Sequence, residues 1–166
     1  GSSFHSNSST SFYQSPFITN VTDNIFCELI VSQGTNSISK SFNIFVNNTS
    51  VESIPSNLVD GINYNTSDTS KATLVLQAPL KDFIYVAGSF NNWNPSSLYA
   101  MKKDTNTGTF WIELTGLTPG QIETYQYWVY DQSPISGSPY EVKTADPYST
   151  LVLSPFDDSY ISDASY

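Results

Sequence analysis

Two short apolar runs decide the fold: ATLVLQA at residues 72–78 and FIYVA at residues 83–87. Proline follows the first run and glycine follows the second, so each run is closed by a residue that interrupts regular structure. Both runs are rich in aliphatic, β-branched and aromatic residues and are too short for a typical helix, which predicts buried strands. Helical spacing of apolar residues is almost absent from the rest of the chain. The sequence therefore predicts an all-β protein.

Further strands are expected on both sides of these runs. The predicted strands are residues 25–31 and 39–46, which form a hairpin, a possible strand around residues 17–18, and residues 109–114, 124–130 and 150–153. Short strands separated by turn signals are typical of an antiparallel β-sandwich. A polar, proline-containing stretch at residues 47–57 marks a boundary between two units. We expect a small or truncated β unit at residues 1–54 and a complete sandwich within residues 55–166.

The charge balance excludes several classes of partner. The chain of 166 residues has six lysines, no arginine and fifteen acidic residues, which gives a net charge of −9. Nucleic acids and anionic membranes are bound through clusters of basic residues, so we expect neither as a partner. No apolar run approaches the ~18–20 residues that span a bilayer.

The sequence also argues against catalysis. A lone cysteine, Cys27, excludes an internal disulfide and a multi-cysteine metal site. A catalytic barrel alone takes ~200–250 residues, and His5 is the one histidine. We expect no cofactor, no metal site and no enzyme activity in this chain. A calcium site formed by Asp146, Asp157 and Asp158 is an alternative, but a solvated acidic surface accounts better for these residues.

The segment GSFNNWNP at residues 88–95 is the strongest candidate for a binding site. A tryptophan at a strand end offers a flat apolar face that can stack on a sugar ring. Side-chain amides both donate and accept hydrogen bonds, as sugar hydroxyls do. Trp93 is therefore a candidate stacking platform, with Asn91, Asn92 and Asn94 beside it. The alternative is that Trp93 is a core aromatic and the asparagines only form the turn.

Residues 88–93 resemble the Gly-Ser-Phe-Asn-Asn-Trp motif of starch- and glycogen-binding early-set domains. These domains occur in AMP-activated kinase β subunits and before the catalytic barrel of bacterial α-amylase-family glycoside hydrolases. Residues 111–120, 125–131 and 143–149 are similar to later family segments, so the resemblance covers roughly residues 60–160. It implies an immunoglobulin-like (early-set) sandwich that binds α-glucan such as starch, glycogen or maltooligosaccharide. It also implies a covalently linked catalytic domain after residue 166 and an extracellular or cell-surface location.

The sequence departs from this pattern in two places. The second tryptophan of the family's glycogen binders is missing after Asp131, and the lysine of their binding face is replaced by Tyr127 or Gln126, depending on the alignment. A one-residue slip exchanges the two faces of a strand, so Trp128 is predicted to be either core or platform. Tyr99, Tyr127 and Trp128 are secondary candidates for sugar contact.

Two hypotheses for function follow. The first is a non-catalytic α-glucan-binding module, and the second is a structural spacer that packs on a catalytic barrel without binding sugar. Trp111 is either an exposed platform or an aromatic packed at a sheet edge. In the N-terminal unit, residues 11–18 and the hairpin resemble the last strands of an immunoglobulin-like domain.

Overall fold

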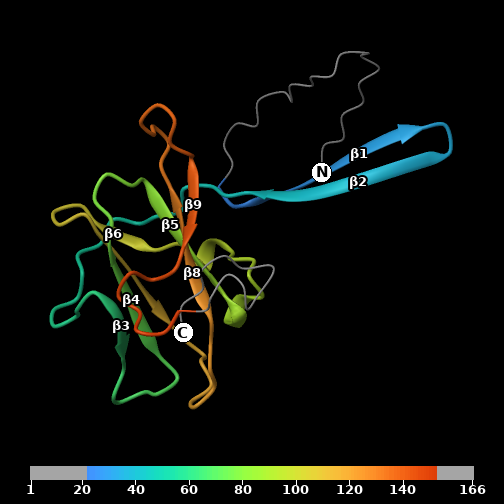
Figure 1. Cartoon of the computed structure of the whole chain (residues 1–166). Coiled ribbons are helices and arrows are strands. Elements are labelled where there is room, and N and C mark those ends of the chain that lie inside the picture. Colours follow the sequence, from blue (N-terminus) through green and yellow to red (C-terminus); the bar gives the residue numbers. More distant parts are fainter. Residues whose placement is uncertain (1–21, 153–166) are drawn as a thin grey trace.

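The computed structural model describes residues 22–152, which form a β-sandwich and a projecting two-stranded arm (Figure 1). The strands are β1 (Ile25–Gln33), β2 (Asn36–Ile44), β3 (Gly61–Tyr64), β4 (Ala72–Gln77), β5 (Phe83–Gly88), β6 (Lys102–Asp104), β7 (Thr109–Leu114), β8 (Tyr125–Tyr130) and β9 (Glu141–Thr144). Two short 3-10 helices, η1 (Ser89–Asn91) and η2 (Ser97–Tyr99), follow β5. No helix within this described part is long and apolar enough to cross a membrane.

Two antiparallel sheets make up the sandwich, in the orders β3-β4-β7-β6 and β5-β8-β9. Alternate side chains of each strand point into the space between the sheets. These inward residues form a fully or nearly fully buried cluster that includes Leu74, Ile84, Val86, Phe110 and Tyr127. The prediction of an all-β antiparallel sandwich is confirmed. The two runs that led to it are β4, an inner strand of the first sheet, and β5, which pairs with the central strand β8 of the second.

The structure differs from the sequence prediction at the edges of the sheets. The short strands β6 and β9 were not predicted, because Lys102–Asp104 and Glu141–Thr144 lack an apolar alternation. Backbone pairing with β7 and β8 defines these strands instead. The predicted strand at residues 150–153 is wrong for Thr150 and Leu151, which lie outside any strand, and Val152 forms only a bridge; Leu153 lies outside the described residues. The predicted strand around residues 17–18 lies outside the described residues.

The arm is a regular hairpin of β1 and β2, paired from Ile25 opposite Ile44 to Gln33 opposite Asn36. It projects from the sandwich, as Figure 1 shows. Directly opposite residues share a face. One face is mainly apolar, with Lys40 in its middle and Gln33 and Asn36 at its tip; the other is mainly polar and carries four serines, Glu28 and Asn43 together with Phe26 and Ile30. Within residues 22–54, the predicted N-terminal unit is this arm followed by a linker.

The linker packs against the sandwich. Val51 forms a parallel bridge with Lys103 in β6, and the indole Nε1 of Trp111 donates a hydrogen bond of 3.2 Å to the carbonyl of Glu52. Trp111 is 5% exposed and has Lys102 Nζ 4.3 Å from its ring centroid. Trp111 is therefore an aromatic packed against the linker and Lys102, and not an exposed platform.

Candidate functional site

Gly88 ends β5 and allows the chain to turn where no other residue fits. A Cβ at this position would lie 2.5 Å from the carbonyl oxygen of Thr124 and 2.6 Å from the ring of Phe90. The φ angle of Gly88 is −166°, which any residue can adopt. The glycine is therefore required by the close approach of neighbouring atoms and not by backbone conformation.

Asn91 holds the turn that follows. Its Oδ1 accepts a hydrogen bond of 2.9 Å from the backbone N–H of Gly88, and its Nδ2 donates one of 2.9 Å to the carbonyl of Val86. One amide side chain thus satisfies a donor and an acceptor at the end of a buried strand. Asn91 is committed to the backbone, so it shapes the site instead of offering a free amide to a ligand.

Trp93 sits at the end of this turn in an unusual backbone conformation. Asn92 and Trp93 have φ angles of 54° and 56°, in the left-handed region that bulky residues rarely adopt. The backbone N–H of Trp93 donates to the carbonyl of Gly88 at 2.9 Å, which fixes the loop. The side chain is partly buried and packs against a cluster on the outer face of the β5-β8-β9 sheet that includes Ala87 and Trp128. The turn thus presents a fixed tryptophan that keeps some surface exposed.

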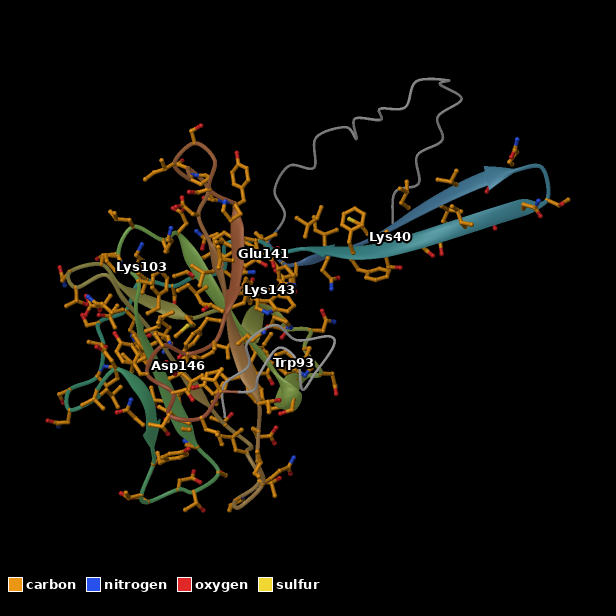
Figure 2. All side chains as sticks on the ribbon, viewed as in Figure 1. Lys40, Trp93, Lys103, Glu141, Lys143 and Asp146 are labelled. Carbon is orange, nitrogen blue, oxygen red and sulfur yellow. The ribbon has the colours of Figure 1, made fainter. Side chains whose placement is uncertain are left out.

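The arm braces the same turn from outside. Asn43 at the base of β2 donates from Nδ2 to Oδ1 of Asn94 at 2.8 Å, and Asn24 donates from Nδ2 to the carbonyl of Pro95 at 3.1 Å. Asn92 and Asn94 are exposed. Figure 2 shows Trp93 on the side of the sandwich from which the arm projects. The turn therefore has contacts both with its own strand and with the arm.

A buried hydroxyl anchors the arm to the sandwich. Tyr85 in β5 is fully buried, and its hydroxyl is within hydrogen-bond distance of Asn24 Oδ1 (2.9 Å), the Val46 carbonyl (2.8 Å) and Asn48 Nδ2 (2.9 Å). Burial raises the pKa of Tyr85, so the group stays protonated. Sequence reasoning missed Asn24 and Asn43, because their partners lie 71 and 51 residues away in the chain and an isolated asparagine carries no periodic signal.

Trp128 lies near Trp93 but is covered. It is 8% exposed, its ring meets Phe45 of the linker edge-on at 5.3 Å, and Lys143 Nζ lies 3.7 Å from its ring centroid. Its position is on the outer face of the sheet, yet the linker and Lys143 cover that face. Trp128 is thus a packed aromatic in the cluster against which Trp93 also packs.

The structure places Tyr99 and Tyr127 away from Trp93. Tyr99 packs with Phe90 at 5.7 Å between ring centroids, against the cluster between the sheets. Tyr127 belongs to the same cluster and has no exposed surface. Of the seven residues predicted from the sequence, the structure brings together four at one turn, namely Asn91, Asn92, Trp93 and Asn94. Trp128 belongs to the cluster against which Trp93 packs.

Asp146 has a structural role within the described residues. Its Oδ2 accepts hydrogen bonds from the hydroxyls of Tyr125 at 2.7 Å and Tyr127 at 3.2 Å, and the residue is 2% exposed. Burial, with Asp146 beside them, raises the pKa values of both tyrosines. Across residues 22–152, no group of three or more histidine, cysteine, aspartate or glutamate residues is placed to hold a metal ion. Asp157 and Asp158 lie outside the described residues.

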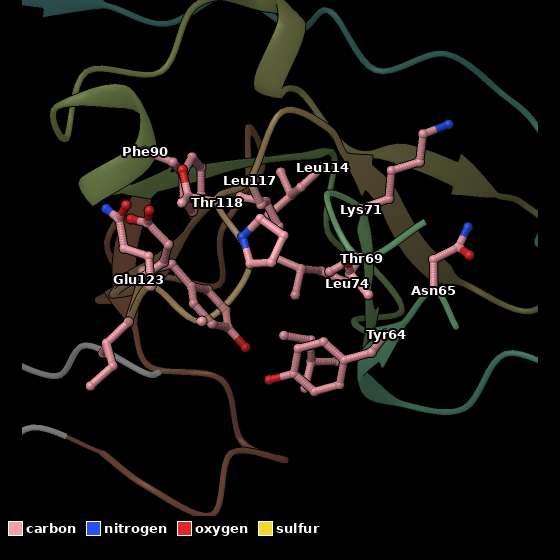
Figure 3. A pocket seen from close by; sticks show the side chains of 17 residues that line it. Tyr64, Asn65, Thr69, Lys71, Leu74, Phe90, Leu114, Leu117, Thr118 and Glu123 are labelled. Atoms are coloured by element: carbon pink, nitrogen blue, oxygen red, sulfur yellow. The ribbon is translucent and has the colours of Figure 1, made fainter. Parts of the chain in front are cut away.

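A pocket of about 530 Å³ opens at one end of the sandwich, and Figure 3 shows the side chains that line it. Its walls are mainly apolar, with Leu74, Leu114 and Leu117 among them, and Tyr64, Phe90 and Tyr125 add aromatic surface. Trp93 and the three asparagines do not line it. The pocket and the Trp93 turn are therefore separate features.

The likenesses found among known proteins are to solved structures. No protein-family model matches the sequence, and no curated protein matches it. Among solved structures, the chain is similar to the apo form of a pullulanase from Paenibacillus barengoltzii, with 20% sequence identity and a TM-score of 0.40. The match covers 55% of this chain and 12% of the pullulanase chain.

Proposed function

We propose that this chain is a non-catalytic α-glucan-binding module of an extracellular or cell-surface α-amylase-family enzyme. Trp93 stacks on a sugar ring, and Asn92 and Asn94 offer amides to its hydroxyls. Asn91 and Trp128 hold the platform in place. The α-glucan as ligand class and the linked catalytic domain both come from the resemblance of residues 88–93 to starch- and glycogen-binding domains. A module of this kind raises the local concentration of an enzyme on an insoluble polymer through many weak contacts.

One observation carries the proposal: a partly exposed tryptophan is held in a left-handed backbone conformation. Such a conformation costs roughly 1–2 kcal/mol for a residue with a Cβ. The hydrogen bond from the Trp93 N–H to Gly88 and the two bonds of Asn91 offset that cost. Residues kept in such regions by their surroundings cluster at binding sites. A tryptophan that only filled the core would not require the chain to keep this costly backbone conformation.

A structural spacer is the second candidate. It is favoured by the burial of Tyr127 and the cover over Trp128. Of the tryptophans in residues 22–152, Trp93 is then the one that is partly exposed and not buried. In that case Trp93 contacts a neighbouring domain instead of a sugar.

Native affinity electrophoresis separates the two candidates. Wild-type protein and the variant Trp93→Ala run side by side in gels that contain amylopectin, glycogen or the β-glucan laminarin. The α-glucan proposal predicts that amylopectin and glycogen retard the wild type, that laminarin does not, and that the variant migrates freely. If a folded wild type migrates equally in all gels, the module is a spacer.

A further inference from the structure

We infer that the binding surface extends from Trp93 onto the arm, with Phe26 as a second aromatic contact for the same α-glucan chain. This inference rests on the proposed function and deepens it, because a site that spans two elements selects a run of sugar units over a single sugar. Phe26 belongs to β1, more than sixty positions before Trp93 in the sequence.

The bridge between the two elements is a pair of asparagines. The hydrogen bond of 2.8 Å from Asn43 Nδ2 to Asn94 Oδ1 brings the base of the arm against the residue that directly follows Trp93. Both side chains are exposed. This hydrogen bond therefore joins β2 to the residue next to Trp93.

The register of the arm places Phe26 at this junction. Phe26 is directly opposite Asn43 in the β1–β2 pairing. Directly opposite residues share a face, with Cβ atoms ~4.5–5.5 Å apart. Because Asn43 faces Asn94, Phe26 projects from the same side of the arm and lies next to the point where the arm meets the turn.

The exposure of Phe26 agrees with a contact role. Its side chain is 68% exposed, and its nearest neighbours on this face of the arm are Asn43 opposite it and Glu28 two residues further along β1, so burial against a core does not explain it. The order along the surface is then Trp93, Asn94, Asn43 and Phe26: an aromatic, two amides and a second aromatic. Aromatic faces with amides between them match a chain of sugars, in which apolar ring faces alternate with hydroxyl groups.

The arm also offers a matched control. Phe42 in β2 is 50% exposed and lies on the opposite face of the arm, because it pairs with Cys27. Replacing Phe42 with alanine removes the same side chain from the same hairpin without touching the proposed surface. Phe26→Ala, Phe42→Ala and Trp93→Ala are therefore compared with the wild type by titration calorimetry, using maltose and maltoheptaose as ligands.

We expect Phe26→Ala to weaken maltoheptaose binding about fivefold, since it loses about half the burial of one aromatic side chain. Maltose binding stays unchanged in this variant, and Phe42→Ala binds both sugars as the wild type does. One result would overturn the inference: Phe26→Ala binds maltoheptaose as tightly as the wild type, whereas Trp93→Ala no longer binds it. The binding surface then does not extend onto the arm, but the proposed function still holds. Equal weakening in Phe42→Ala also overturns the inference, because the effect then reflects the arm's structure. A wild type that binds neither sugar contradicts the proposed function itself.

Discussion

Asn91→Ala tests how the turn that carries Trp93 is held. The substitution removes two hydrogen bonds of 2.9 Å, one to the N–H of Gly88 and one to the carbonyl of Val86. Each such bond contributes about 1 kcal/mol net, and a buried partner left unsatisfied adds to the cost. Val86 is fully buried, so we expect a loss of about 2–3 kcal/mol in the free energy of unfolding. For a domain of this size, that corresponds to a fall of about 8–12 °C in Tm.

The assay is equilibrium unfolding in urea, followed by the fluorescence of the tryptophans. Asn92→Gly is the matched control: Asn92 is exposed, and its positive φ suits glycine. We expect the control to stay within about 0.5 kcal/mol of the wild type. An Asn91→Ala protein as stable as the control would refute the argument that this side chain holds the turn.

Three further predictions concern the surroundings of the site. Tyr85→Phe removes the hydroxyl that meets Asn24, so we expect a loss of about 2 kcal/mol in urea unfolding; wild-type stability would mean that the hydroxyl does not anchor the arm. Gly88→Ala places a Cβ 2.5 Å from the Thr124 carbonyl, which should cost about 1–3 kcal/mol in a thermal melt; an unchanged melt would contradict the close approach. Burial raises the pKa of Tyr127 well above 10, so the folded state keeps a proton that the unfolded state releases. Stability is therefore complete below about pH 10 and falls by about 1.4 kcal/mol per pH unit above it for this group. Unfolding between pH 8 and pH 11.5 should show a shallower fall in Tyr127→Phe, and equal slopes would argue against the raised pKa.

Strands β4 and β5 and the turn after β5 could be predicted from the sequence because their signals are local. Each of these strands is an unbroken apolar run, and the glycine that ends β5 directly follows its run. The cover over Trp128 could not be predicted in the same way, because it depends on strand register and on Phe45, which comes from a linker more than eighty positions earlier. Strand β9 was missed for a related reason: backbone pairing with β8 defines it, and its side chains carry little apolar pattern.

The central claim is that Trp93 contacts an α-glucan, and two-dimensional NMR of the three indole N–H groups tests it most directly. Trp111 donates its indole N–H to the Glu52 carbonyl, and Trp128 is 8% exposed beneath Lys143. On addition of maltoheptaose, we expect the Trp93 indole signal to shift in a saturable way, the Trp111 signal to stay fixed and any change at Trp128 to be small. A Trp93 indole signal that does not move on addition of maltoheptaose would contradict the account.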